Sequence, residues 1–448
     1  MLAFVLASLI KGFTLKKWLL SVLITLALLL LVAPGIVGRL AEQNIEENID
    51  WAEGDSPAIN IQTERFERGW YTSVGVHRLV LEGGQFAEAT LAYRKSTGNN
   101  ELPSLVITTD MAHGLLPGGS LRPGLASTRS TFQIDPGNGE LINIPGKLTS
   151  NIGLAGDSDW RLLLEAGSHQ IDDAAIEWLG MDINFISNPG PGTMTVEGEI
   201  SPWRIVADDT TFDVAAISIK ADQVRSGRGF NVGTVEMEMG RVEVIEDGMS
   251  FSINSVSLTG VTSIEGDRLN ARSAFAVNTM TIPVVGDVSL DVDFDISGAD
   301  AAASGAIAAV LQKAQSAPGS EVALANVYPQ IEDDLGTLFA KGFTVNMEKL
   351  DVTLPQGTVS LALEISIPES DAGGPVNWSS VLLKMSGNLA VRIPASIYQM
   401  AAIFSPEAGQ MNAMGILVQD GENYVMNAEY AHGLFNVNGA PMPIPLPQ

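Results

Sequence analysis

The chain has 448 residues, of which 52 are acidic and 25 are basic, so its net charge at neutral pH is −27. This acidic balance argues against binding to nucleic acid, because phosphate contacts need clustered lysine and arginine side chains. The absence of cysteine excludes disulfides and a lipid-modified N-terminal cysteine, yet a chain of this length can bury an apolar core without disulfides.

The first feature of the chain is an uncharged segment from Trp18 to Gly38. As a helix that rises about 1.5 Å per residue, it would extend over about 31 Å, which matches a bilayer hydrocarbon core of roughly 30 Å. We therefore predict a transmembrane helix over residues 18–38. Residues 1–10 are also apolar but too short to cross a membrane, so they either lie at the interface or precede the true start of the protein.

Charge on the two sides of the span predicts its orientation. Three lysines precede the span, and the first acidic residue follows it. The positive-inside rule therefore places residues 1–17 in the cytoplasm and residues 39–448 outside, with the span as an uncleaved signal anchor. The exported region keeps 22 of the 25 basic residues and all 52 acidic ones, which gives it a net charge of −30. A cleaved secretory signal is the less favoured alternative, because the apolar core is long and no A-x-A site follows it.

Strand-like alternation of apolar and polar residues dominates the exported region, most clearly at 288–296, 359–367 and 381–393. The alternation changes phase near Gly240–Arg241, which indicates a bulge or a turn. Turns are also indicated by pairs rich in glycine, asparagine and aspartate: Pro355–Gly357, Asp420–Gly421 and Asn438–Gly439. The pattern predicts a long succession of short antiparallel strands.

Helical spacing interrupts this pattern at about 300–342 and 394–415. Asp300 is placed to cap a helix over 301–315, and Gly342 is placed to end a second helix that begins after Pro329. A further helical stretch begins at Pro394 and restarts at Ser405–Pro406.

The predicted fold class is therefore mainly β with α insertions (α+β). We expect an N-terminal transmembrane helix followed by an elongated, twisted, antiparallel β-rich body. The two helical interruptions lack the composition of linkers, and the body has room for two lobes that meet near residue 300.

Side chains that carry chemistry are sparse. The four histidines are far apart in sequence, and none has a second ligand at zinc spacing: His77, His113, His169 and His432. The acidic run 291–295 lacks the glycine and glutamate of a calcium loop, so a solvated strand face is favoured over a metal site. No nucleophile elbow, phosphate-binding loop or dinucleotide motif occurs. We predict no catalytic, cofactor-binding or metal-binding residues and no cofactor.

The sequence Ala-His-Gly-Leu occurs twice, at 112–115 and at 431–434. Each copy lies between strand-like segments, so the favoured interpretation is a tight turn with glycine at a positive φ angle. A paired site formed by His113 and His432 is the sharper alternative.

Four short motifs follow one another along the chain: Gly69-Trp70-Tyr71-Thr72-Ser73, His113-Gly114, Ile176-Glu177-Trp178-Leu179-Gly180, and a closing stretch with Gly421, Tyr424 and Gly433–Gly439. Together they resemble the YdgA-like bacterial family, which is catalogued as domain of unknown function family 945. Leu115 departs from the family pattern, in which proline follows His-Gly. The resemblance covers the chain beyond the anchor. It implies an inner-membrane-anchored envelope protein of Gram-negative bacteria and no catalytic residues.

Two classes of function follow from these observations. The first is a non-enzymatic protein of the inner membrane, held through residues 18–38, whose periplasmic β-body serves as a scaffold or binds a lipid or an envelope protein. It requires an apolar sheet face that helices or a second sheet do not cover. The alternative is a periplasmic hydrolase with dispersed carboxylates and histidines, which requires at least two of His113, His169 and His432 to converge with nearby acids.

Overall fold

The structure is a computed structural model. It describes residues 59–442 apart from 83–89, 91–93, 96–100, 115, 120–122, 138–140, 172–173, 189, 191, 208–209, 229, 247, 284, 317–326, 371–375 and 377. The predicted transmembrane helix at 18–38 and the cytoplasmic segment 1–17 therefore lie outside the described residues. Within the described part, no helix is both long enough and apolar enough to span a membrane.

The chain divides into two compact units, the first ending at Leu162 and the second running from Leu163 to the C-terminus, with residues 188–190 assigned to the first. This division is not at the predicted lobe boundary near residue 300. Residues on both sides of 300 belong to the second unit, because the strands that flank the helical insertion pair directly with each other.

The first unit is an antiparallel meander in which each strand pairs with the next along the chain. Its strands are β1 (Ile59–Arg68), β2 (Thr72–Leu81), β3 (Ser104–His113), β4 (Ala126–Asp135) and β5 (Ile142–Ile152), followed by β6 (Ser158–Leu164) at the boundary, and the short 3₁₀ turn η2 (Pro117–Gly119) lies between β3 and β4. Many residues that are buried in this sheet are small and polar, which differs from the apolar pattern of the second unit.

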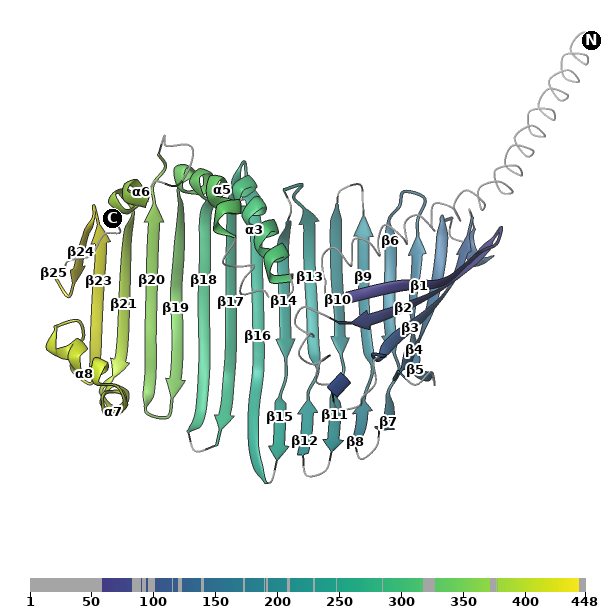
Figure 1. Cartoon of the computed structure of the whole chain (residues 1–448), viewed down its shortest axis with the longest axis horizontal. Helices are drawn as coiled ribbons and strands as arrows, with labels where there is room; N and C mark the ends of the chain where they lie inside the picture. Colours follow the sequence, from purple (N-terminus) through teal and green to yellow (C-terminus); the bar gives the residue numbers. More distant parts are fainter. Residues whose placement is uncertain are drawn as a thin grey trace, which may run out of the picture. The chain divides into compact units, whose positions relative to one another are not determined.

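The second unit is antiparallel throughout the registers that are described. Its strands are β7 (Gly167–Ile171), β8 (Ala174–Trp178), β9 (Met181–Asn188), β10 (Thr193–Ile200), β11 (Trp203–Ala207), β12 (Thr210–Val214), β13 (Ile217–Arg225), β14 (Asn231–Met239), β15 (Val242–Glu246), β16 (Met249–Glu265), β17 (Arg268–Ile282), β18 (Gly286–Asp300), β19 (Phe343–Leu354), β20 (Gly357–Ile367), β21 (Ser386–Pro394), β22 (Val418–Asp420), β23 (Asn423–Ala431), β24 (Leu434–Val437) and β25 (Ala440–Met442). From β16 to β21 these strands lie side by side in chain order (Figure 1). The mainly β prediction with helical insertions is confirmed.

Helices lie at the ends of these strands (Figure 1). At one end are α3 (Ala301–Ser316), α5 (Tyr328–Lys341) and α6 (Trp378–Lys384), and at the other are α7 (Ala395–Phe404) and α8 (Pro406–Ala413). The carboxylate of Asp300 caps α3 by accepting hydrogen bonds from the Ala302 and Ala303 amides, at 3.1 and 2.9 Å. Gly342 ends α5 at a φ angle of 71°. The two predicted helical interruptions are confirmed, as are the Asp300 cap and the Gly342 terminus in the first, although α5 begins at Tyr328 and not after Pro329.

One predicted strand starts too early. The alternation at 381–393 predicts a strand throughout, but β21 begins at Ser386, and residues 378–384 form α6. The cause is packing outside the segment, since the Trp378 ring lies 5.4 Å from that of Phe339 on α5, and Tyr430 on β23 donates a hydrogen bond to the Leu382 carbonyl. A run this short fits both the two-residue period of a strand and one helical turn.

Candidate functional site

The most extensive feature of the second unit is a row of apolar side chains that crosses nine neighbouring strands. Register places its members directly opposite one another. We call this set the apolar row: Ile219, Met237, Leu258, Phe275, Val292, Leu350, Leu361, Val391 and Met426. At about 4.8 Å between strands, the row extends over roughly 40 Å. Side chains opposite each other in antiparallel strands share one face, so the row marks a continuous apolar face.

Beta-bulges keep this face apolar where the sequence changes phase. On β19, Met347 pairs with Leu363 and Leu350 pairs with Leu361, so that Glu348 and Lys349 together oppose Ala362. If these residues formed a regular ladder without the bulge, one half of β19 would turn its apolar side chains to the opposite face. β17 has the same three-residue spacing between Val277 and Met280. The bulges therefore preserve one apolar face against a break in the alternation.

The members of the apolar row are all half-buried, and none is fully buried. Fully buried apolar side chains lie beside the row, at the paired Val256 and Val277, and also in clusters at the strand ends. One cluster joins α3 and α5 around Val327 and Ile331, and another joins α7 to β23 around Tyr398 and Tyr424. The predicted strand 288–296 lies on β18, where Val288 is buried and the other four apolar side chains of the alternation are half-buried. The middle of the face is thus shielded mainly by its own neighbours.

A crease crosses the same sheet at six positions on one level, of which four are breaks between successive strands and two are irregularities within β16 and β17. The interruptions lie at residues 179–180, 201–202, 215–216, 240–241, 254–255 and 278–279. Backbone hydrogen bonds connect them, for example from the Ala215 amide to the Arg241 carbonyl at 2.7 Å. Ser255 takes a positive φ angle of 52° at this level. The predicted phase change at Gly240–Arg241 is confirmed as one part of this crease.

The opposite, polar face carries paired charges. Arg272 contacts Asp293 at 2.5 Å and Glu348 at 3.0 Å, and Lys349 pairs with Asp291. The hydrogen bond to Asp291 raises the pKa of Lys349 above its ordinary value. The acidic run 291–295 is therefore a strand face on which Asp291 and Asp293 pair with basic side chains from adjacent strands. Within the described residues, no group of three potential ligands is arranged to hold a metal ion.

Among the described residues, the polar face of the second unit has hollows that include the following two. The larger, about 680 Å³, lies over β19–β24 and is lined by Asn346, Glu364, Asn388 and Glu429 among others. The smaller, about 410 Å³, lies at the crease, where Arg204 pairs with Asp213 at 3.3 Å.

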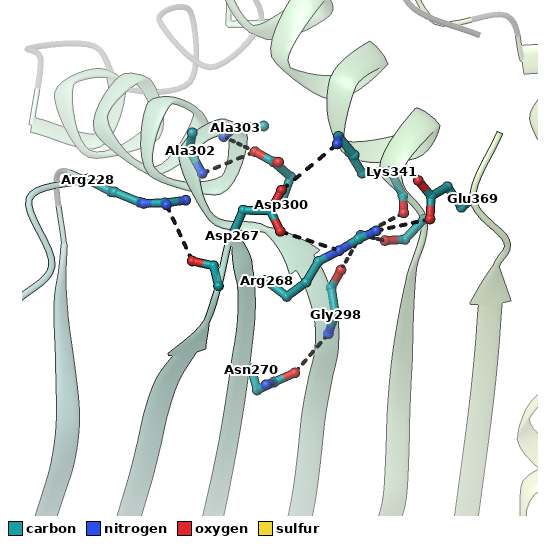
Figure 2. Close-up of polar contacts among 12 residues, drawn as sticks. Arg228, Asp267, Arg268, Asn270, Gly298, Asp300, Ala302, Ala303, Lys341 and Glu369 are labelled. Carbon is teal, nitrogen blue, oxygen red and sulfur yellow. Dashed lines mark hydrogen bonds and ion pairs between the residues drawn. The ribbon is translucent and has the colours of Figure 1, made fainter. Parts of the chain in front are cut away.

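The C-terminal end of α5 is held by one arginine, Arg268, which Figure 2 shows. The Arg268 guanidinium donates hydrogen bonds to the carbonyls of Gly298, Lys341 and Gly342, at 2.8, 2.6 and 3.1 Å, and lies 3.3 Å from a Glu369 oxygen. Carbonyls in the last turn of a helix lack partners within it, so a cation there is favourable. Arg268 therefore connects the ends of α5, β18 and β20 to the start of β17. Sequence reasoning missed this role because its partners lie 30 to 101 residues away.

Within the second unit, His169 and His432 lie far from each other. His169 is on β7 and the exposed His432 is in the loop between β23 and β24, with ten strands of the second unit between them. His432 and Gly433, at φ angles of 53° and 76°, form the predicted tight turn. In the other copy of the tetrapeptide, His113 instead ends β3 as a buried residue of the first unit, and Gly114 follows at a φ angle of 122°.

His113 has a specific partner within the first unit. Its Nε2 lies 3.1 Å from the Ser73 hydroxyl, a distance found in nucleophile–base pairs. Both side chains are only 2% exposed. The pair also links the start of β2 to the end of β3, which is a structural role that needs no access from solvent.

Comparison with known proteins gives one match. A family model described as a bacterial protein of unknown function (DUF945) matches residues 15–445. Neither a curated protein nor a solved structure matches the chain.

Proposed function

Since the chain belongs to the DUF945 family of bacterial proteins of unknown function, its activity has to be argued from its own residues, and we propose that it is a non-enzymatic envelope protein that binds an apolar ligand on the apolar face. The ligand is a lipid or an apolar segment of an envelope protein. In this proposal, residues 18–38 anchor the chain in the inner membrane, residues 1–17 remain in the cytoplasm, and residues 39–448 extend into the periplasm as an elongated, twisted β-body.

The single observation that carries the proposal is the unbroken, half-buried apolar row. Burial of solvent-accessible apolar surface is favourable by about 25 cal/mol per Å². A ligand that covers the nine side chains of the row would therefore gain binding free energy from their burial. Three-residue phase breaks that are corrected by bulges keep polar side chains off this face. A sheet needed only as a spacer would not require that correction.

Co-purification tests the proposal. The full chain is extracted in detergent, and bound lipids and proteins are quantified by mass spectrometry. Leu361→Asp places a charge in the apolar row and should lower the bound amount several-fold. Ser360→Asp, on the opposite face of the same strand, should leave it unchanged. Finding neither lipid nor protein at stoichiometric amounts with the unaltered chain would reduce the proposal to a passive scaffold.

A second candidate is a periplasmic hydrolase, which the contact between Ser73 and His113 favours. A fluorophosphonate that reacts with activated serines distinguishes the two. Labelling that is abolished by Ser73→Ala would establish a nucleophile. We expect no labelling, because a side chain that is 2% exposed does not meet a bulky reagent.

A further inference from the structure

The turn between β1 and β2 presents two aromatic side chains to solvent. Trp70 is 56% exposed and Tyr71 is 51% exposed. The turn is closed by a hydrogen bond from the Gly69 amide to the Thr72 carbonyl at 2.8 Å, and a Cβ atom on Gly69 would lie 2.6 Å from that oxygen. The turn is therefore tight, and glycine is required at its first position.

Local folding preferences do not explain these aromatics. Two-residue hairpin loops favour asparagine and glycine, and this chain follows that preference elsewhere, at His432–Gly433 and Asn438–Gly439. Large aromatic side chains that stay half exposed in a turn where local rules favour other residues indicate a functional position. The loop is also fixed in place, because the His113 amide donates a hydrogen bond to the Tyr71 carbonyl at 2.9 Å.

The side chains around the loop suit a membrane surface. Trp and Tyr are the residues enriched at the headgroup level of bilayers, where the ring is buried and its polar group stays hydrated. The adjoining end of β1 alternates Glu64, Arg65, Glu67 and Arg68 and is neutral overall, with Arg65 3.6 Å from Glu67. Within an exported region of net charge −30, this neutral tip would meet little repulsion from anionic headgroups.

The short chain between the proposed span and β1 keeps the Trp70–Tyr71 loop close to the bilayer. Twenty residues separate Gly38 from Ile59, which limits the separation of the span and β1 to about 70 Å at full extension. A tethered loop binds intramolecularly at an effective concentration that reaches millimolar, so two aromatic side chains suffice for contact. We propose that the Trp70–Tyr71 loop inserts into the headgroup layer of the same membrane that holds residues 18–38. This inference rests on the anchor of the proposed function.

The experiment uses the absence of cysteine in the chain. Thr72→Cys, an exposed position beside the loop, is labelled with a fluorophore in the full chain reconstituted into vesicles of phosphatidylethanolamine and phosphatidylglycerol. Lipids with a nitroxide at the headgroup should quench this fluorophore. In the same background, Trp70→Ser with Tyr71→Ser should lose most of that quenching, several-fold, while the thermal midpoint stays unchanged because both side chains are exposed.

Alkaline carbonate extraction separates failure of the loop from failure of the anchor. The inference is supported if the labelled parent chain and the double variant both stay in the membrane after carbonate extraction and only the double variant loses quenching. Retention with no quenching of the original loop overturns it and leaves the anchor standing. Release of the chain by carbonate overturns the anchor; if quenching is also absent, the loop contact is overturned with it. Equal quenching of both chains would show that the aromatics do not make the contact.

Discussion

Within each unit, one arginine side chain connects partners that are distant in sequence. Arg268 satisfies three carbonyls at the end of α5 and β18. Arg78 plays a comparable part in the first unit, where it contacts Glu64, Ser104 and Asp135 across three strands, at 2.5 to 2.8 Å. The Glu64 and Asp135 carboxylates raise the pKa of Arg78. Each position can be tested by truncation.

Arg268→Ala should destabilise the second unit by about 2–3 kcal/mol, because several charge-assisted hydrogen bonds are lost and helix-end carbonyls are left unsatisfied. Arg268→Lys keeps a point charge without the planar fork, so it should recover part of that loss. The measurement is the urea midpoint of each full-length chain. A midpoint for Arg268→Ala equal to that of the unaltered chain would contradict the stabilising role of Arg268.

His77 predicts a dependence of stability on pH. It is 7% exposed, and burial lowers its pKa below the ordinary value of 6.5. Between the folded pKa and 6.5, His77 is protonated in the unfolded chain but not in the folded chain. The stability contribution of His77 therefore falls as pH drops below 6.5 and becomes constant below the folded pKa. His77→Gln should lose less stability than the unaltered chain between pH 7.5 and pH 5, as measured by the urea midpoint. An identical loss in both chains would contradict this role of burial.

At the scale of elements, the bulge on β19 makes opposite predictions for two deletions. Removing Glu348 leaves Met347 opposite Leu363 and Leu350 opposite Leu361 with regular alternation, so the sheet should fold at a cost of about 1 kcal/mol, chiefly from the lost contact with Arg272. Removing Ala362 instead turns half of β20 over and moves Glu364 to the apolar face, which should cost several kcal/mol or prevent folding. Circular dichroism and urea midpoints compare the two. Equal effects would show that the bulge does not fix the face.

Elements with strong local signals could be predicted from the sequence, and those that depend on pairing could not. The capped helix at 301–315, the termination at Gly342 and the turn at Asn438–Gly439 each carry their cause within a few residues. The alternation predicts a strand at 381–384, but these residues belong to α6, because that helix is stabilised by contacts with α5 and β23.

The candidate site could be predicted only in kind. Alternation in single strands indicated an apolar face, but the apolar row depends on which strands are neighbours and on bulges that restore the phase. Likewise, nothing near Arg268 in the sequence indicates that its partners include Lys341 and Glu369. Spatial neighbours more than 20 residues apart leave no periodic signal.

For the whole molecule, the proposed topology gives a direct prediction. Cysteine placed at the exposed Gln356 should react with a membrane-impermeant maleimide in cells whose outer membrane has been opened, because residues 39–448 are proposed to be periplasmic. Cysteine at Ser8, in the proposed cytoplasmic segment, should react only after the inner membrane is lysed. Reaction of both positions before lysis, or of neither, would contradict the proposed orientation.

The central proposal is that the apolar face binds an apolar ligand, and site-specific photocrosslinking in living cells tests it most directly. A benzophenone amino acid is placed at Leu361 in the apolar row, and as the matched control at Ala362, the next residue on the opposite face. We predict crosslinks to a lipid or to one protein from position 361 that are several-fold more abundant than from position 362. Equal crosslinking from both positions, or none from position 361, would contradict the account.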